Sequence, residues 1–328
     1  MRYDAPTLSQ LSEIPTLMHV SLITSLYRGE AYLPTYGQHV KRLLSSVEQA
    51  GLDVEILVIA NDPTPTERTL LAELPVRVIE TARETLYASW NRGIAAMTSD
   101  VFGVWNIDDE RDGAALVEGY ALMQQGYTLV DAPSRVVQTQ AGLFPRRRTF
   151  MRPVFIHETK RFTRTHVTNT FMLIHRRLFD EIGLFDPNFR IMGDLEWSGR
   201  AQPVARIALL PQAGGTYYLH GNNLSGTGST RQMIEENIVF LRRQQWDEVR
   251  PTPDPKAMRD AWDTWGNPAN ISLPDDLAAR LWGDLAQEEW HIWQREHVRR
   301  QRRLAWRRRL RSVTDRLHLT PLLMRLRR

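Results

Sequence analysis

Two adjacent carboxylates, Asp108 and Asp109, are the residues whose types and spacing point most directly to chemistry. They end the run VFGVWNI (101–107), whose β-branched and aromatic side chains predict a strand buried on both faces. Ligands of open α/β sheets bind at the carboxyl ends of strands. Because neighbouring carboxylates repel each other, the pair favours a hard divalent metal ion that also contacts phosphate oxygens. A solvated turn after a strand is the simpler alternative.

The elements that must position this pair alternate along the chain. Apolar patterns predict strands at 19–25, 54–60, 76–79, 101–107, 129–132, 168–174 and 216–220. They predict helices at 34–50, 64–74, 87–97 and 233–243, and a helix followed by a turn at 175–189. Strand and helix in units of roughly 20 to 40 residues predict a parallel sheet of βαβ construction.

Three of the predicted strands end in polar residues: Thr24 and Ser25, Asn61 and Asp62, and Asp108 and Asp109. On one edge of one sheet these residues would line a common cleft. The glycine-rich loops G-x-G-x-x-G and G-x-x-x-x-G-K-[ST] are absent, which argues against a dinucleotide or P-loop fold. A bound nucleotide diphosphate would therefore need another source of positive charge, which a carboxylate-held metal ion supplies.

Four segments in order resemble the inverting family 2 glycosyltransferases of the GT-A fold, of the bacterial polysaccharide or glycolipid type. The segments are VSLITSLYRGEAYLP, EILVIANDPTPTE, LYASWNRGIAAMTSDVFGVWNIDDE and LFDEIGLFDPNFRIMGDLEW. They match, in outline, a strand with a Thr or Ser end, an acidic nucleotide-binding turn, an N-x-G helix, a strand ending in D-x-D and a later E-D helix. The resemblance implies an α/β, Rossmann-like fold: a mainly parallel sheet flanked by helices, with a helical C-terminal appendage.

The resemblance also implies the residues of a donor site: Thr24, Ser25, Tyr27, Asn61, Asp62, Asn91, Asn106 and Asp108. Asp108 would bind Mg²⁺ or Mn²⁺, and His220, after the last predicted strand, would contact the metal ion or the diphosphate. The first acid of the usual D-x-D motif is Asn106 here, which contributes no charge. We therefore expect weak metal affinity, and strict metal dependence is open.

The catalytic base implied by the resemblance is Asp194, in the sequence GDLEW. A carboxylate beside the acceptor hydroxyl can take its proton as the oxygen attacks. Gly193 stands where the family usually has Glu. Glu196 and Trp197 are secondary candidates, as is Asp109, and positions i and i+2 of a helix face different ways, so Asp194 and Glu196 should have different roles.

Composition sets the domain boundaries and excludes several classes of site. The chain has 328 residues, 42% of them apolar and none of them cysteine, so disulfides, zinc–thiolate sites and thiol nucleophiles are excluded. We expect a non-secretory leader at 1–18, the transferase domain at 19–250 and a Trp/Arg-rich helical region at 251–328. No apolar run reaches the roughly 18 residues of a membrane span, which predicts a cytoplasmic protein, free or peripheral on the inner face of the membrane.

The C-terminal 38 residues hold thirteen arginines against two acids, a net charge of +11 that leaves −7 for the rest of a +4 chain. A basic tail on an acidic body argues against nucleic acid as a partner. On one helix, an apolar half would be formed by Leu281, Trp282, Leu285, Trp290 and Trp293. This pattern favours an interfacial helix on anionic lipid, and packing of the Trp residues on the transferase domain is the alternative.

These features together predict transfer of a sugar from a nucleotide-diphosphate donor, UDP-sugar in the first place, to an acceptor hydroxyl with inversion. The partners would be that donor and a saccharide or lipid-linked acceptor, in the synthesis of cell-surface polysaccharide or glycolipid. The basic stretch 136–164 is either a patch for an acidic acceptor or a solvated loop. Two alternatives are a non-catalytic sugar-nucleotide-binding scaffold at the membrane and a nucleotidyltransferase, although SLYRGE lacks the Gly-rich basic loop typical of the latter.

Overall fold

The computed structural model describes residues 18–138, 148–152, 156–158, 164–166, 170–220, 223 and 229–316. The chain forms two compact units, Met1–Thr227 and Gly228–Arg328, each of which is described by itself. The sequence instead predicts a functional boundary between residues 250 and 251, which stays a prediction, as does the leader at 1–18. Most of the basic stretch 136–164 lies outside the described residues.

The first unit alternates strands and helices, as the sequence pattern predicts. Its strands are β1 (Met18–Leu26), β2 (Leu52–Asn61), β3 (Arg77–Thr81), β4 (Val101–Val104), β5 (Glu110–Arg111), β6 (Leu129–Asp131), β7 (Ser134–Gln138), β8 (Arg148–Arg152), β9 (Ile156–Glu158), β10 (Arg164–His166), β11 (Leu173–His175), β12 (Ile207–Leu209) and β13 (Gly215–Leu219). Its helices are α1 (Leu33–Glu48), α2 (Pro65–Ala72), α3 (Leu86–Ala96), α4 (Gly113–Gln124), α5 (Arg177–Ile182) and α6 (Gly193–Ala201).

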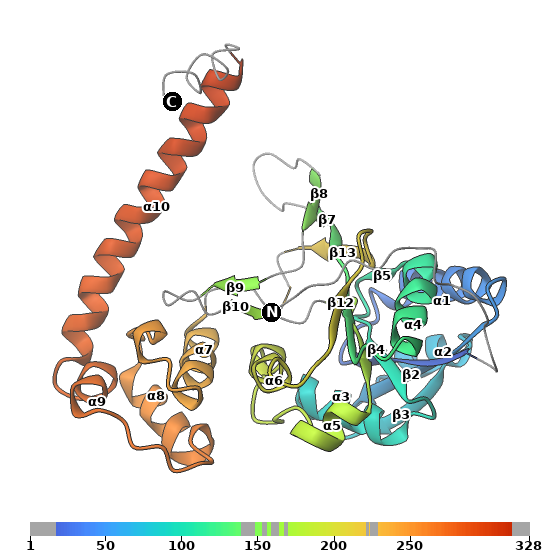
Figure 1. Cartoon of the computed structure of the whole chain (residues 1–328), viewed down its shortest axis with the longest axis horizontal. Helices are drawn as coiled ribbons and strands as arrows, with labels where there is room; N and C mark the ends of the chain where they lie inside the picture. Colours follow the sequence, from blue (N-terminus) through green and yellow to red (C-terminus); the bar gives the residue numbers. More distant parts are fainter. Residues whose placement is uncertain are drawn as a thin grey trace. The chain divides into compact units, whose positions relative to one another are not determined.

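A seven-stranded sheet with the order β12-β6-β11-β4-β1-β2-β3 forms the centre of this unit (Figure 1). Its strands pair in parallel except at β11, which runs antiparallel to β4 and to β6. Successive β1 side chains point to opposite faces of the sheet, and helices cover both of these faces. Leu22 packs in the core with α1 and α4, whereas Ile23 lies against Gly93 of α3. The predicted α/β class with a mainly parallel sheet is confirmed.

Two predicted strands are shorter than expected. The run 101–107 is a strand only as far as Val104, because the chain then turns and the Asp109 amide donates to the Asn106 carbonyl over 3.1 Å. The strand predicted at 168–174 is described only as β11, Leu173–His175. The turn at 105–109 presents both acidic residues at the carboxyl end of β4.

A cluster of six aromatic side chains packs α3, α5 and α6 on the face of the sheet opposite α1. Its members are Tyr87, Trp90, Phe102, Phe179, Phe185 and Trp197, with neighbouring ring centroids 4.8–5.8 Å apart. Phe179 stacks on Trp197 at 4.8 Å, which joins α5 to α6. Aromatic pairs of this kind stabilise beyond the area that they bury. The aromatic cluster thereby fixes α6, the helix that carries Asp194.

A smaller sheet, β5-β13-β7-β8, adjoins the turn that follows β4. Its β13 pairs antiparallel with β5 and parallel with β7. Gly215 of β13 has no room for a side chain, since an added Cβ would lie 2.1 Å from the Glu110 carbonyl oxygen. This close approach brings β13, which leads to His220, against the segment that follows the acidic turn.

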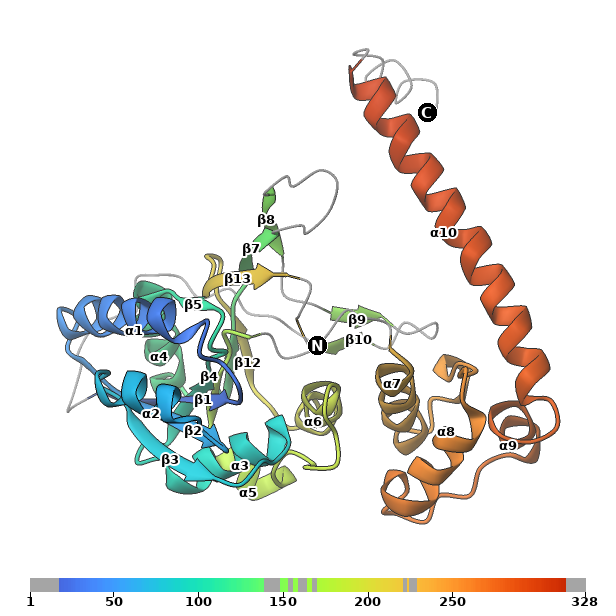
Figure 2. The same cartoon turned by 180° about the vertical axis from the view of Figure 1, so that it is seen from behind.

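The second unit is helical in its described residues. It contains α7 (Thr230–Arg242), a 3-10 turn η2 (Trp246–Glu248), α8 (Pro255–Ala261), a π-helical turn η3 (Trp262–Gly266), α9 (Asp275–Leu281) and α10 (Ala286–Arg316). Figure 2 labels α7, α8, α9 and α10. The expectation that Leu281 to Trp293 lie on one helix is wrong. Leu281 ends α9, Trp282 leaves the helical region with a φ of −149°, and α10 begins only at Ala286.

The helix α10 carries stacked aromatic side chains, and several of its described charged side chains are exposed. Trp290 stacks on Trp293 at 5.2 Å, and Trp293 stacks on His297 at 4.7 Å. Arg299 and Arg300 are exposed, and Trp306 is 63% exposed. No helix among the described residues is both long and apolar enough to cross a membrane.

Candidate active site

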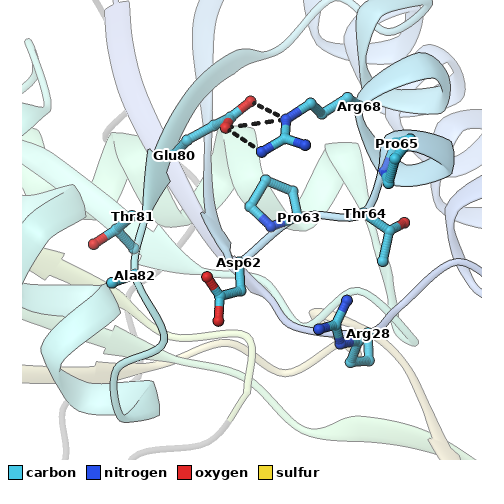
Figure 3. A pocket seen from close by; sticks show the side chains of 9 residues that line it. All are labelled: Arg28, Asp62, Pro63, Thr64, Pro65, Arg68, Glu80, Thr81 and Ala82. Atoms are coloured by element: carbon cyan, nitrogen blue, oxygen red, sulfur yellow. Dashed lines mark hydrogen bonds and ion pairs between the residues drawn. The ribbon is translucent and has the colours of Figure 1, made fainter.

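An open cleft of about 650 Å³ lies at the carboxyl ends of β2 and β3 (Figure 3). Asp62 and Arg28 face it from one side of Pro63, and both adopt left-handed backbone conformations, with φ of 45° and 51°. Non-glycine residues rarely adopt this conformation, which here turns two charged side chains toward the cleft. A carboxylate and a guanidinium side by side can bind a nucleobase edge and an anionic group of one ligand.

The loops of this cleft are joined by a buried carboxylate, Glu67. One of its oxygens accepts from the Gly29 amide at 2.6 Å, and the other accepts from the Thr64 amide at 2.9 Å. Glu67 is fully buried and also completes the capping box that starts α2. It therefore ties the loop after β1 to the loop after β2, which keeps Arg28 and Asp62 on one cleft.

Tyr27 offers an aromatic surface beside Arg28. Its ring is 42% exposed, and the guanidinium carbons of Arg28 and Arg83 lie 5.4 and 4.4 Å from the ring centroid. Each contact is a cation–π interaction, which orients the ring and brings positive charge next to it. An exposed ring of this kind can stack on a nucleobase.

Two predicted donor residues, Thr24 and Asn61, are buried and serve the scaffold. The Thr24 hydroxyl lies 2.8 Å from the Tyr36 hydroxyl. The Asn61 amide nitrogen donates to the Leu26 carbonyl and to Ser89, and its oxygen accepts from the Glu84 amide at 3.0 Å. These two side chains fix the strand ends, whereas Ser25 is half-buried.

Asp108 pairs with His220 across 112 residues of sequence. The His220 Nε2 atom lies 2.9 Å from Asp108 Oδ2, and the imidazole ring stacks on Tyr32 at 5.7 Å. Both side chains are about one fifth exposed, so a ligand can reach them. The predicted juxtaposition of these two residues is thus present in the geometry, and their binding of a metal ion stays a prediction.

Asp109 points the other way, into the protein. Its carboxylate accepts from the Tyr218 amide at 3.0 Å and from the Asn106 side chain at 2.9 Å. Burial raises the pKa of Asp109 well above its usual value, and the neighbouring Asp108 charge raises it further, while these two hydrogen bonds act in the opposite direction. Asp109 therefore links the turn to β13 by a hydrogen bond, and the Asn106 side chain donates to the same carboxylate.

Asp194 lies in the first turn of α6 and contacts Tyr87 of α3. Its Oδ1 atom accepts from the Leu195 amide at 2.8 Å and lies 3.1 Å from the Tyr87 hydroxyl. Gly193 has no room for a side chain, since an added Cβ would lie 2.6 Å from Tyr87 Cδ2. A half-buried carboxylate in the first turn of a helix is well placed to act as a base and is stabilised there by the helix dipole.

Three other predicted site residues support α6 and its approach. Glu196 forms two hydrogen bonds of 2.9 Å with Arg200. The Trp197 indole donates to the Gly183 carbonyl at 3.2 Å, and Asn91 donates to the Phe185 carbonyl and accepts from the Phe185 amide. The hydrogen bonds of these three side chains therefore hold α6 and the segment that leads into it.

Sequence analysis missed several residues that shape this site: Arg28, Glu67, Tyr87, Arg83 and Arg111. Arg28 sits in the SLYRGE loop, where a lone Arg carries no recognisable spacing. The T-x-x-E pattern of Thr64 and Glu67 is a capping-box signal that predicts a helix start, but not the second bond of Glu67 to another loop.

Comparison with known proteins gives a match to one family model. Residues 21–183 match the model of glycosyl transferase family 2. The comparison with curated proteins gave no match.

Several solved structures are similar to this chain at low sequence identity. S. aureus TarS 1-349 in complex with UDP-GlcNAc is similar with a TM-score of 0.52 and 14% identity, over 83% of this chain and 82% of that chain. Another TarS 1-349 structure gives 0.49 and 14%, over 68% and 65%. The mannosyltransferase PcManGT from Pyrobaculum calidifontis, in complex with GDP-Man and Mn²⁺, gives 0.46 and 12%, over 78% and 71%.

The chain spans 39% of the length of a longer TarS chain. At these identities the likeness concerns the fold, a mainly parallel α/β sheet flanked by helices in the GT-A arrangement. Over residues 21–183, the sequence is similar to glycosyl transferase family 2.

Proposed function

We propose that this protein is an inverting glycosyltransferase that moves a sugar from a nucleotide-diphosphate donor to an acceptor hydroxyl. The pairing of Asp108 with His220 carries the proposal, because a carboxylate and an imidazole from distant segments meet at 2.9 Å beside the strand ends. The UDP-GlcNAc complex of TarS supports a UDP-sugar as the donor. The acceptor would be a saccharide or a lipid-linked saccharide of a cell-surface polysaccharide or glycolipid.

The donor-binding part of the mechanism follows from the cleft. Asp62 accepts a hydrogen bond from an N–H of the base, and Tyr27 stacks on the base. The guanidinium groups of Arg28 and Arg83 bring positive charge next to this position, which favours a ligand that carries phosphates. The nucleoside is thereby oriented with its diphosphate toward the turn that carries Asp108.

Asp194 supplies the base in this mechanism. Its carboxylate takes the proton of the acceptor hydroxyl as that oxygen attacks the anomeric carbon, and the bond to the diphosphate breaks on the opposite side. The configuration at the anomeric carbon is inverted by this single displacement. No covalent enzyme intermediate forms.

Asp108 and His220 together fit a divalent cation. Among the described residues, no group of three or more His, Cys, Asp and Glu side chains could enclose a metal ion. Mg²⁺ in nucleotide sites is, however, bound through one or two protein carboxylates, with substrate phosphates and water as the other ligands. Mg²⁺ or Mn²⁺ held by these two side chains would neutralise charge on the departing diphosphate.

Replacement of Asp108 by Ala should weaken binding of UDP about tenfold or more in Mn²⁺, and at most about threefold in EDTA. The difference arises because the carboxylate acts on the phosphates through the ion. Isothermal titration of UDP into both proteins, in both buffers, measures it. Equal losses with and without metal would assign Asp108 a role in the fold of the turn instead.

We also propose that α10 binds an anionic membrane surface, which would bring the enzyme to a lipid-linked acceptor. The exposed arginines of this helix include Arg299, Arg300, Arg302 and Arg303. Each basic residue near an anionic surface contributes about 1 kcal/mol, and Trp side chains such as Trp290 sit at head-group depth. Since Leu281 and Trp282 lie outside α10, charge carries more of this binding than an apolar face does.

Changing Arg299, Arg300, Arg302 and Arg303 together to Gln should abolish sedimentation of the full chain with phosphatidylglycerol vesicles at low salt. The matched variant with Lys at the same four positions should still sediment, because the charge is kept. Raising the salt should release the wild-type protein in the same way. A wild-type chain that ignores these vesicles at low salt would show that α10 has another role.

Hydrolysis of the donor tests the enzymatic proposal itself. The wild-type chain should release UDP from UDP-GlcNAc, or GDP from GDP-mannose, in the presence of Mn²⁺, with water as a slow acceptor. A mass-spectrometric screen of nucleotide sugars for binding identifies the donor. Tight binding without any turnover, even with acceptors, would indicate a sugar-nucleotide-binding scaffold.

A further inference from the structure

The helix α3 fastens the segment that leads into α6 by three side chains. Thr85 donates to the Pro187 carbonyl at 2.7 Å, Asn91 to the Phe185 carbonyl at 2.7 Å, and Tyr87 to the Ile191 carbonyl at 2.8 Å. All three partners are main-chain oxygens of residues 185–191. Tyr87 differs from Thr85 in also reaching a side chain, the carboxylate of Asp194.

The Tyr87 ring is fixed by its surroundings. It is 1% exposed, meets Trp90 edge-on at 5.1 Å and lies 5.8 Å from the Phe185 ring. It also occupies the space that a side chain at Gly193 would need, at 2.6 Å from an added Cβ. Because Gly193 has no side chain, the first turn of α6 can pack directly against the Tyr87 ring.

The Tyr87 hydroxyl has one hydrogen, and two oxygen atoms of described residues lie within its reach. Asp194 Oδ1 is at 3.1 Å and the Ile191 carbonyl oxygen is at 2.8 Å. While Asp194 is charged, donation to its carboxylate is favoured, because hydrogen bonds to ionised groups are the stronger ones. Once Asp194 holds a proton, the hydroxyl can turn to Ile191 and leave the carboxyl group in place.

We infer that Tyr87 is a positioning residue for Asp194, whose hydroxyl holds the carboxylate in the orientation needed to take the acceptor proton. This inference rests on the proposed function. It connects donor and acceptor sides as well, because α3 is also joined to the end of β2 through Ser89 and Asn61. The helix α3 thus contacts both the strand end where the nucleotide would bind and Asp194, the proposed catalytic base.

The variant Tyr87→Phe keeps the ring and removes the hydroxyl. We expect kcat for hydrolysis of UDP-GlcNAc, or of whichever donor the wild type turns over, to fall about tenfold, with KM for that donor within about twofold of wild type. The melting temperature should change little, because the aromatic contacts remain. A fall in kcat at constant KM would indicate that the hydroxyl orients Asp194, whereas a rise in KM would indicate damage to the donor cleft.

Thr85→Val is the matched control. It removes another tether to the same segment, and also the cap of α3, but does not touch Asp194. Its kcat should stay within about twofold of wild type, although its melting temperature should fall by roughly 2 to 4 °C. Equal loss of kcat in both variants would show that Tyr87 only fastens the segment 185–191 and does not orient Asp194.

Tyr87→Phe with unchanged kcat would overturn the inference and leave the proposed function standing. A Tyr87→Phe chain that does not fold, as judged by circular dichroism, would also overturn it, because a hydroxyl that positions one carboxylate is not required for folding. A wild-type chain that turns over no nucleotide sugar would instead contradict the proposed function, and the inference with it.

Discussion

We expect replacement of Asp194 by Asn to lower kcat by a factor on the order of 10² to 10⁴, while the affinity for the donor nucleotide should stay within about twofold. Asn has nearly the shape of Asp and can still accept from the Leu195 amide and from Tyr87. It cannot take a proton from the acceptor hydroxyl, so the loss falls on the chemical step. Steady-state kinetics with a saturating donor, together with titration of UDP, measure both quantities.

Asp186→Asn provides the matched control for this variant. Asp186 lies in the same approach to α6, and its Oδ1 atom accepts from the Asn188 amide at 2.9 Å, in a turn that Asn also forms. The same chemical change at this position should leave kcat within about twofold. An Asp194→Asn enzyme that keeps most of its turnover would remove Asp194 from the role of base.

The mainly parallel sheet is predictable from sequence because its longer inner strands are built around buried apolar side chains. In the run 54–60, residues 56–60 are all apolar and buried, and in the run 19–25 the apolar side chains Val20, Leu22 and Ile23 are buried. The strand order is a different matter. β11 enters between β4 and β6 in the antiparallel direction, which no periodicity of the three residues Leu173–His175 could indicate.

The candidate site is predictable in part for the same reason. Side chains at strand ends, such as Asp62 and Asp108, follow from the rule that ligands bind at the carboxyl edge of the sheet. Side chains that act through tertiary contacts do not. Glu67 and Tyr87 sit on helices, and their second partners, Gly29 and Asp194, lie on other elements.

Burial also separates Asp108 from Asp109, which the sequence presents as equals. Asp109 is fully buried and bonded to β13, whereas Asp108 is partly exposed beside His220. Which of the two acids faces the ligand depends on the turn at 105–109. The apolar run predicts a strand as far as residue 107, and this prediction does not tell which of the two carboxylates faces the ligand.

Arg111 is the buried residue whose loss should destabilise the first unit most. It is 6% exposed, and its guanidinium donates to the carbonyls of Val104 at 2.7 Å, of Phe171 at 2.7 Å and of Met172 at 3.2 Å. It thereby joins the end of β4 to the start of β11 from its position on β5. Burial lowers the pKa of Arg111 to about 9 while the charge of Asp131 acts in the opposite direction, so the side chain is cationic at neutral pH.

Arg111→Met should lower the free energy of unfolding by about 3 to 5 kcal/mol, because three carbonyl groups lose the guanidinium donor and the buried Asp131 loses the attraction of the Arg111 charge. Arg111→Lys should cost less but still more than 1 kcal/mol, since an ammonium group cannot span the three carbonyls. Arg206→Met is the control, because Arg206 donates to the Gln125 carbonyl at an exposed position and should cost about 1 kcal/mol or less. Urea unfolding monitored by circular dichroism, with the slopes compared between variants, measures these differences. If Arg111→Met and Arg206→Met have equal midpoints, the guanidinium does not hold β4 against β11, and the turn that carries Asp108 must be fixed by Asp109 and β13 instead.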